Sequence, residues 1–418
     1  MGGGMAHNAY RIAAGIIYIL GYSILLYKKE IIMKKTLAAV AVLGAFAGSA
    51  LAADVTLYGR VNLGVNYTHT DKGSVETDDF TLNSGDATAS RWGIKGSEQI
   101  SEGLTVGFTL ESGFNADDGD DQEDKLFRRE SRLYVTTDFG TLHMGRFGAL
   151  DAATGSLDYT GWLSASGTGY GDIINDHGRV LKTYGRLDNS IAYTSPTFAG
   201  MTIAAMASLG NDNSELTKVT VTNGKVGFAY DTDGEGSSNV DRYYGLGVKG
   251  QWGALGAGLV VSMVDAGHDA FTASYDGTDW TRKTGDDNYN VTAGVNYDFG
   301  VAKVFLAGNY FKGGEVSKYT NGTFDSKTET SSWGVSTSVS APLASGTLEA
   351  AVAYGISTDE TAGKADVETK VLNVGAFYKY PLSKRTYVYA GAGYDQSEKD
   401  GDDKKKTIEA ISGIVHQF

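Results

Sequence analysis

Many segments of the sequence alternate apolar and polar residues with a period of two. In "VTLYGRVNLGVNY" (55–67), apolar Leu57 and Val65 occupy one parity, whereas Arg60 and Asn62 occupy the other. Because successive side chains of a strand point to opposite faces, this alternation predicts a β-strand whose two faces meet different surroundings.

The same pattern predicts sixteen strands along the chain. They are 55–67, 90–98, 104–113, 128–137, 141–147, 189–195, 201–208, 242–252, 255–264, 288–299, 302–312, 332–341, 347–357, 369–380, 386–396 and 407–418. The chain holds 57 glycines, 25 tyrosines and only 3 prolines, which favours an all-β protein with uninterrupted strands. A β-sandwich also alternates, so the pattern alone does not identify the architecture.

The connections between these strands alternate between short and long. Tight turns such as 101–103, 138–140 and 344–346 are followed by long polar segments. This rhythm is typical of an antiparallel up-and-down barrel that crosses a membrane. Since an unpaired backbone group in hydrocarbon costs several kcal/mol, such strands must close into a ring. We therefore predict a transmembrane β-barrel of about sixteen strands over residues 53–418.

A membrane also explains the two faces of the strands. An arginine facing lipid near the middle of the membrane would cost about 2–4 kcal/mol, so Arg60 is predicted to face the lumen. Aromatic residues at strand ends are predicted to lie on the outer face at the membrane interface, with an internal core as the alternative. They are Tyr67, Trp252, Tyr289, Tyr297, Phe299 and Trp333.

The N-terminal part predicts export. Residues 33–52 run from two lysines through an apolar stretch to small residues, which is the pattern of a signal peptide cleaved after Ala52. Residues 1–32 precede this signal and are interpreted as an upstream extension from a misplaced start codon, with a membrane anchor as the alternative.

The five basic residues and one acid of 1–52 leave 31 basic and 49 acidic residues. A charge near −18 excludes nucleic acid as a partner.

The longest segment without a strand pattern, 148–188, follows the fifth predicted strand. A loop of this length is usually functional or disordered, and in a barrel it can fold inward and narrow the passage. A loop that extends outward into solvent is the alternative. The acids of this segment are candidates to line the passage: Asp151, Asp158, Asp172 and Asp176.

Parity also places cations on the lumenal face of the first six strands. They are Arg60, Arg91, Lys95, Arg128, Arg132 and Arg186. Such a cluster predicts a positively charged wall that acts on passing ions.

The acidic run 117–125 lacks the spacing of an EF-hand and is interpreted as a solvated outer loop rather than a cation site. The sequence has no cysteine and no G-x-S-x-G or H-E-x-x-H motif, so no enzyme activity, metal or cofactor is predicted.

Several motifs together resemble the general diffusion porins of Gram-negative outer membranes. The matching pieces are "LYGR" (57–60), "SRWGIKGSE" (90–98), "DFGTLHMGR" (138–146), "GRLDNSIAYTSPTFAGM" (185–201) and the terminal Phe418. Those porins are sixteen-stranded homotrimers. The resemblance implies a water-filled channel for small hydrophilic solutes and ions in the outer membrane, in contact with lipopolysaccharide.

The resemblance also implies roles for particular residues. In that family, basic residues at the positions of Arg60, Arg91, Arg132 and Arg186 line a constriction opposite acids of an inward-folded third loop. A terminal aromatic such as Phe418 is recognised by the barrel-assembly machinery. The "PEFGG" element common in that loop is missing here, so the resemblance does not identify the acid that faces the arginines. We hypothesise a passive channel with weak anion preference; a substrate-selective channel and an adhesin or receptor barrel are the alternatives.

Overall fold

The computed structural model describes most of the predicted barrel. It covers residues 55–418 except 122–124, 168, 171–179, 211–214, 223–224, 232–240, 267–270, 276–277, 283–285, 316–318, 321–322, 325–327 and 362. The predicted signal peptide, 33–52, and the predicted upstream extension, 1–32, lie outside the described residues. Among the residues that are described, no helix has the length and apolar character needed to cross a membrane.

Strands make up nearly all the regular structure. The elements are β1 (Thr56–Lys72), β2 (Val75–Ser84), β3 (Arg91–Ser101), β4 (Leu104–Gly113), β5 (Glu130–Thr137), β6 (Gly140–Gly148), the short 3-10 helix η1 (Gly161–Leu163), β7 (Arg186–Thr194), β8 (Met201–Ser208), β9 (Glu215–Thr222), β10 (Lys225–Asp231), β11 (Arg242–Trp252), β12 (Leu255–Asp265), β13 (Phe271–Tyr275), β14 (Thr278–Arg282), β15 (Asp286–Asp298), β16 (Lys303–Glu315), β17 (Tyr319–Thr320), β18 (Thr323–Phe324), β19 (Thr328–Leu343), β20 (Gly346–Thr361), β21 (Val367–Pro381), β22 (Thr386–Lys399) and β23 (Lys405–Gln417).

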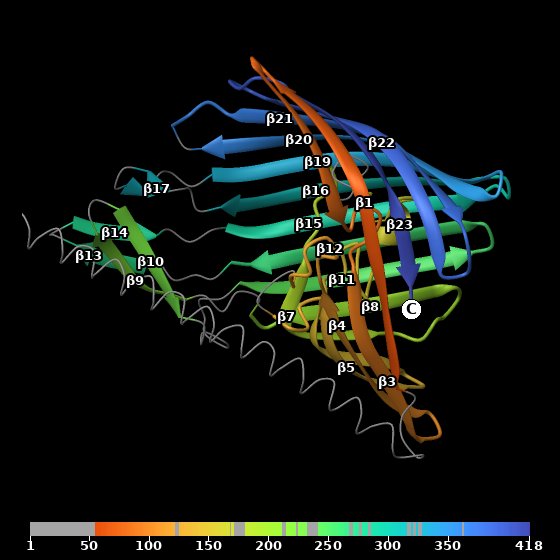
Figure 1. The fold of residues 1–418 in the computed structure, drawn as a ribbon. Coiled ribbons are helices and arrows are strands. Elements are labelled where there is room, and N and C mark those ends of the chain that lie inside the picture. The colour runs from red at the N-terminus through yellow and green to blue at the C-terminus, as the bar shows by residue number, and fades with distance from the viewer. Residues whose placement is uncertain are drawn as a thin grey trace, which may run out of the picture. The chain divides into compact units, whose positions relative to one another are not determined.

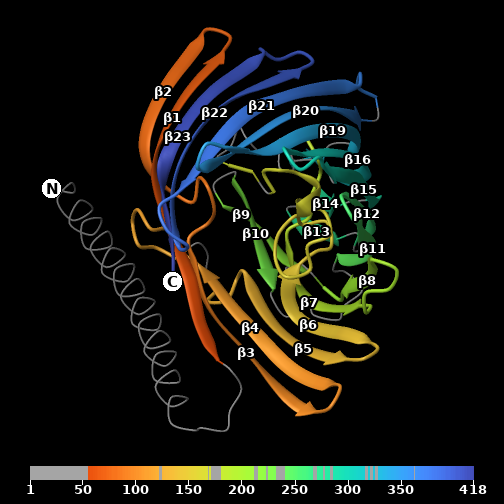
Figure 2. The ribbon, with the colours of Figure 1, turned by 90° about the vertical axis from the view of Figure 1, so that its right-hand side faces the viewer.

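Seventeen of these strands form one closed antiparallel sheet (Figure 1, Figure 2). The first strand, β1, pairs with the last, β23, from Arg60 opposite Gln417 to Lys72 opposite Lys405. On its other edge β1 pairs with β3 along its first half and with β2 along its second half. Since β2 and β3 are two parts of one barrel strand, the barrel has sixteen strands, as the sequence predicts.

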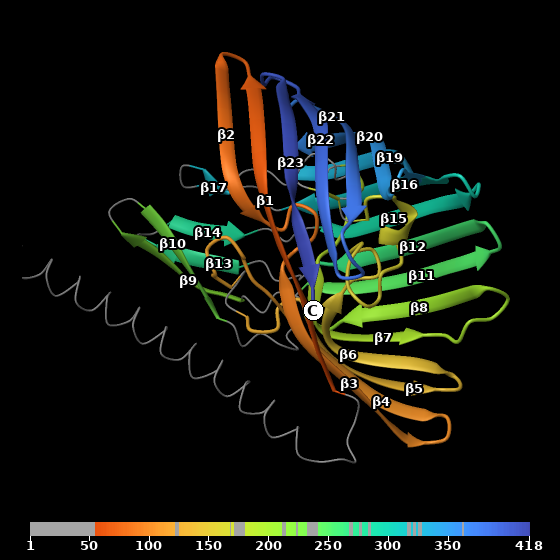
Figure 3. The same ribbon diagram turned by 45° about the vertical axis from the view of Figure 1, so that its right-hand side comes forward.

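The first long connection differs from the sequence prediction. The pattern predicts a polar segment between 67 and 90, but β1 continues to Lys72 and a turn at Gly73 (φ +64°) leads into β2. The two strands form a hairpin at one rim (Figure 3). Most side chains of β2 are exposed, so its pairing with β1 does not depend on a buried apolar face and leaves little periodic signal. Short hairpins β9–β10, β13–β14 and β17–β18 also lie in connections predicted as polar segments.

Side-chain burial confirms that the strands have two different faces. On β15, Tyr289, Val291 and Tyr297 are between 36% and 50% exposed, whereas Asn290 and Asn296 are each 1% exposed. The apolar face therefore points outward and the polar face inward. The six strand-end aromatics predicted for the membrane interface are all exposed: Tyr67, Trp252, Tyr289, Tyr297, Phe299 and Trp333.

A cation in the middle of the outer face should destabilise the barrel. Leu246 lies near the middle of β11 and is 63% exposed. We expect Leu246→Arg to lower the free energy of unfolding in a bilayer by about 2–4 kcal/mol, because the guanidinium would lie in hydrocarbon. Denaturant titration of the protein in phospholipid vesicles measures this, with Leu246→Ile as the control. An unchanged midpoint for the arginine variant would contradict a lipid-facing position.

Candidate functional site

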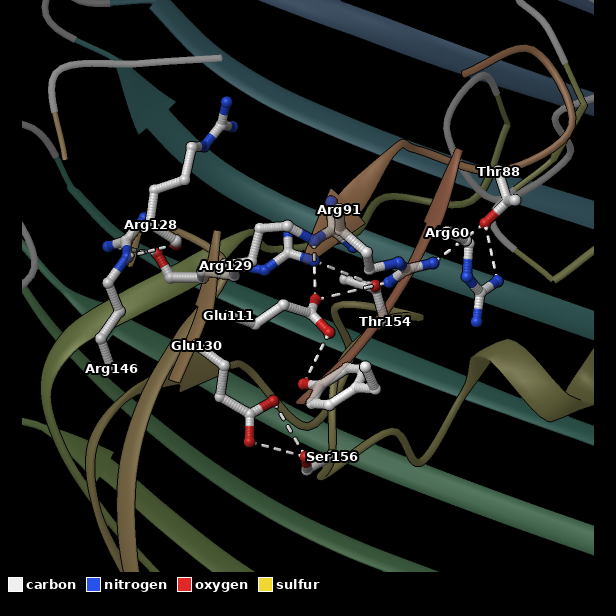
Figure 4. Close-up of polar contacts among 12 residues, drawn as sticks. Arg60, Thr88, Arg91, Glu111, Arg128, Arg129, Glu130, Arg146, Thr154 and Ser156 are labelled. Atoms are coloured by element: carbon white, nitrogen blue, oxygen red, sulfur yellow. Dashed lines mark hydrogen bonds and ion pairs between the residues drawn. The ribbon is translucent and has the colours of Figure 1, made fainter. Parts of the chain in front are cut away.

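Arginines converge around the carboxylate of Glu111 on the inner face of β4 (Figure 4). Glu111 accepts a hydrogen bond from Nε of Arg129 at 2.7 Å and one from the hydroxyl of Tyr58 at 3.0 Å. A terminal nitrogen of Arg91 lies 3.5 Å from the same carboxylate. Arg60 lies directly opposite Arg91 in the pairing of β1 with β3. The parity of β1, β3 and β4 thus brings Arg60, Arg91 and Glu111 to one face, and Arg129 joins them from the chain before β5.

A second carboxylate, Glu130, lies directly opposite Glu111 in the pairing of β4 with β5. Two carboxylates opposite each other on one face repel, so each needs its own cation. Glu130 accepts a hydrogen bond from Nε of Arg132 at 2.6 Å. The hydroxyl of Ser156, in the segment between β6 and β7, lies 2.6 and 2.9 Å from its two oxygens. Glu130 therefore balances the charge of Arg132 and holds part of that segment.

Arg132 is fixed within the wall. Besides Glu130, its guanidinium contacts the hydroxyl of Thr109 at 3.3 Å and Nδ1 of His143 at 2.7 Å. An arginine only donates hydrogen bonds, so this nitrogen of His143 is the acceptor and carries no proton. The other ring nitrogen then carries the proton and donates to Thr194 at 3.2 Å.

A short segment between β2 and β3, 85–90, reaches the arginines. The hydroxyl oxygen of Thr88 accepts hydrogen bonds from Arg60 at 3.1 Å and from Arg91 at 2.9 Å. Asn62 holds this segment, because its side-chain amide donates to the carbonyl of Thr88 and its backbone nitrogen donates to the hydroxyl of Ser90, both at 3.0 Å. No periodic pattern marks residues 85–89, so the position of Thr88 is not predictable from the sequence.

Described residues of the segment between β6 and β7 (149–167, 169–170 and 180–185) contact side chains of several barrel strands. Ala149, Leu150, Leu157 and Tyr159 form a buried cluster with inner-face side chains of β7, β8, β11 and β12. Farther along, Leu163 and Leu181 pack with Ala307 of β16. These apolar contacts join the segment to the wall at several successive strands.

Asp151 anchors this segment. Its side chain is 1% exposed, and it accepts hydrogen bonds from Tyr243 at 2.9 Å, Ser262 at 2.5 Å and Asn290 at 2.8 Å. Burial raises the pKa of the Asp151 carboxyl, while the three hydrogen bonds act in the opposite direction. A carboxylate enclosed by three donors is a structural anchor rather than the acid facing the passage that the sequence suggests.

Of the other three candidate acids of this segment, the structure describes Asp158. The side chain of Asp158 accepts hydrogen bonds from the backbone nitrogens of Thr160 at 2.9 Å and Gly161 at 2.6 Å. Lys249 of β11 donates to the backbone carbonyl of Asp158 at 2.6 Å. Asp158 therefore shapes the turn that leads into η1. The other two candidates, Asp172 and Asp176, lie outside the described residues.

A second anchor lies at Tyr170, farther along the same segment. The Tyr170 hydroxyl donates a hydrogen bond to Glu349 of β20, whose carboxylate also binds the ammonium of Lys379 at 2.6 Å. The Tyr170 ring stacks on Phe377, with centroids 3.8 Å apart. Burial, reinforced by the Glu349 charge, raises the pKa of Tyr170, so this hydroxyl stays protonated and remains a donor.

Comparisons with known proteins identify the family. A model described as Gram-negative porin matches residues 38–400. The chain belongs to this porin family. It is 29% identical over 422 residues to an outer membrane porin protein of Bordetella pertussis, covering 92% of this chain and 100% of the relative. It is 28% identical over 375 residues to outer membrane porin protein 32 of Delftia acidovorans, covering 87% of this chain and 89% of that one.

Solved structures agree on the fold. The anion-selective porin from Comamonas acidovorans superposes with a TM-score of 0.55 at 21% identity, over 88% of this chain and 100% of that one. OmpT of Vibrio cholerae with loop L8 deleted gives a TM-score of 0.56 at 16% identity, over 88% and 100% of the two chains. The protein is an outer-membrane porin with a sixteen-stranded barrel.

The remaining predicted cations of the porin lie at different distances from Glu111. Arg186, at the start of β7, donates to the hydroxyl of Thr154 in the 149–185 segment at 3.3 Å. Lys95 faces inward on β3, four residues beyond Arg91, and its ammonium lies 5.2 Å from the ring centroid of Tyr58. At about 3.3 Å per residue, Lys95 is more than 10 Å along the strand from Arg91.

Arg128 lies outside a strand. The sequence predicts a strand over 128–137, but β5 begins at Glu130. Figure 4 shows its side chain directed away from Glu111 and Glu130. Its backbone carbonyl accepts a hydrogen bond from Nε of Arg146 at 2.6 Å. The alternation of a strand does not extend into the irregular chain that precedes it, so parity gives no direction for the Arg128 side chain.

Three charged residues around Glu111 are absent from the sequence prediction: Glu111 itself, Arg129 and Glu130. The alternation of the strands does place both glutamates on the inner face. Glu111 has the parity of Thr109 on β4, and Glu130 has the parity of Arg132 on β5. The prediction sought acids only in the long loop. Arg129 precedes its strand, and no pattern gives its direction.

Removing the Asp151 anchor should loosen the 149–185 segment. We expect Asp151→Ala to lower the free energy of unfolding by about 1–3 kcal/mol, because Tyr243, Ser262 and Asn290 lose their acceptor. Thermal unfolding measures the loss, and limited proteolysis should cut the variant within 149–185 faster than the parent. Asp138→Ala, in an exposed turn, is the control. Equal cleavage rates for the two variants would contradict an anchoring role.

Proposed function

We propose that this porin is a passive channel for small hydrophilic solutes and ions with a weak preference for anions. The observation that carries the preference is the excess of guanidinium over carboxylate groups near Glu111. Arg91 and Arg129 both contact this single carboxylate, and the Thr88 hydroxyl joins Arg60 to Arg91. Glu130 is already paired with Arg132 and adds no compensating charge.

Uncompensated guanidinium groups attract anions entering a water-filled passage. Arg186, at the start of β7, adds a further guanidinium, which donates to the neutral hydroxyl of Thr154. Selectivity stays weak as long as water screens these charges and an ion can leave as readily as it enters. A structurally similar porin, that of Comamonas acidovorans, is anion-selective, which supports the same sign here.

The segment 149–185 is the proposed size limit of the channel. Its anchors on β11, β12, β15 and β20 support an inward-folded position, where it would narrow the lumen. Asp158 is the described loop acid whose carboxylate is not enclosed by wall residues, but its hydrogen bonds go to its own turn. Glu111 and Glu130 therefore take the place of loop acids in this proposal.

Assembly follows the family in this proposal. We expect a homotrimer embedded in outer-membrane lipid and lipopolysaccharide, with no enzymatic activity; OmpT of Vibrio cholerae has a trimer form.

Phe418 is the proposed signal for the barrel-assembly machinery. Its backbone forms two hydrogen bonds with Gly59, each of 3.1 Å, so the last residue extends the pairing of the closing strand. A Cβ at Gly59 would lie 2.4 Å from the Phe418 ring, which explains the glycine at this position.

Neutralising the arginines should change ion selectivity. We expect Arg60→Gln and Arg91→Gln each to lower the anion-to-cation permeability ratio, and Glu111→Gln to raise it, because the first two remove positive charge and the third removes negative charge. Reversal potentials across planar bilayers under a salt gradient measure the ratio. Lys384→Gln, in an exposed turn, is the matched control. Cation preference in the parent protein would overturn the proposed sign.

The trimer gives a distinct electrical signature. We expect single-channel recordings at high voltage to show closures in three equal steps, since each barrel conducts separately. A single-step closure would contradict three independent pores. Saturable current block by one solute would favour the substrate-selective alternative. For an adhesin or receptor, deletion of outer loops would abolish ligand binding and leave conductance intact.

A further inference from the structure

Thr88 lies where two arginines of the pore meet. We propose that the segment 85–90 is a selectivity-determining element and that Thr88 is its positioning residue, holding Arg60 and Arg91 in the arrangement that attracts anions. This inference rests on the anion preference proposed above and names a residue that controls it.

The geometry at Thr88 counters a repulsion between like charges. Arg60 and Arg91 occupy directly opposite positions on neighbouring strands, and like charges in such pairs destabilise one another. The Thr88 hydroxyl oxygen accepts a hydrogen bond from each guanidinium, at 3.1 and 2.9 Å. One oxygen with two lone pairs therefore fixes both cations at one point. Hydrogen bonds from charged donors are stronger than those between neutral groups.

Thr88 differs from Glu111 in what it does to the charge. Glu111 carries a negative charge that offsets part of the positive charge of Arg91 and Arg129. The hydroxyl of Thr88 is neutral, so it orients Arg60 and Arg91 and leaves their charge available to a passing anion. Loss of the hydroxyl should let the two guanidinium groups move apart, and the positive potential at this point of the passage should fall.

The segment that carries Thr88 is held firmly by Asn62, which is fully buried. Besides its two donated bonds to the segment, the backbone carbonyl of Asn62 accepts a hydrogen bond from the hydroxyl of Ser90 at 3.2 Å. The side-chain oxygen of Asn62 accepts one from Tyr389 of β22 at 2.9 Å. Three hydrogen bonds between Asn62 and the segment thus place the Thr88 backbone relative to β1, the strand that also carries Arg60, and the fourth ties Asn62 to β22.

A second contact joins this segment to the long one. Ala87 packs in a buried cluster with Tyr170 of the 149–185 segment and with Phe377 and Tyr389 of the wall. The two segments therefore share a support on β21 and β22. This shared cluster makes 85–90 part of the structure that shapes the passage, although it is only six residues long.

The test compares variants of Thr88 in planar bilayers under a potassium chloride gradient. Thr88→Val keeps the volume and removes the acceptor, and Thr88→Ser keeps the hydroxyl and removes the methyl group. We expect the valine variant to lower the anion-to-cation permeability ratio by about twofold or more, and the serine variant to keep the parent ratio. Thr88→Ala removes the hydroxyl without adding an apolar group and should match the valine variant, which covers the case in which valine prevents folding.

Two outcomes would overturn the positioning role. One is a parent-like ratio in every variant lacking the hydroxyl, and the other is an equal loss in Thr88→Ser and Thr88→Ala. The double variant Arg60→Gln/Arg91→Gln separates this inference from the proposed function. If that double variant keeps the parent ratio, the proposed anion preference fails. If it lowers the ratio, adding Thr88→Ala should cause no further loss, because Thr88 acts through these arginines; an additional loss would also overturn the inference.

Discussion

The sixteen-stranded barrel wall of this porin separates hydrocarbon from water, and the rest of the structure depends on that constraint. Hydrocarbon admits no unpaired backbone groups, so the sheet must close, as it does where β1 meets β23. The same medium excludes charge from the outer face, so the polar side chains of sixteen strands share one interior. Arg60, Arg91 and Glu111 come together because adjacent strands have no other face on which to place them.

Within that interior, individual charges are treated differently. Glu130 pairs with Arg132, and the buried carboxylate of Asp151 is bound by three neutral donors and serves as an anchor. Arg91 and Arg129 share the single carboxylate of Glu111, and the neutral hydroxyl of Thr88 binds Arg91 and Arg60. The net charge that the inner face presents to the lumen thus depends on which cations are paired with a carboxylate and which bind only a hydroxyl.

The strands, and the face to which each of their side chains points, were predictable because the alternation of apolar and polar residues is a local property of the chain. Parity alone places Arg60, Arg91 and Arg132 inward, and the same rule applied to acids would have found Glu111 and Glu130. Segments without a period were not predictable. The contacts of Thr88 and the enclosure of Asp151 depend on where irregular chain folds against distant strands, up to 139 residues away for Asn290. The strand β2 was missed because nearly all its side chains are exposed.

The pairing of β1 with β23 has a consequence for biogenesis. Arg60 faces Gln417, so residues from the two ends of the barrel domain must meet before its perimeter is complete. Such distant contacts slow folding, and until they form, a partly exported chain carries unsatisfied strand edges that favour self-association. The barrel therefore cannot close before its last strand is available to β1. Truncation at the carboxyl terminus would leave an aggregation-prone intermediate rather than a smaller pore.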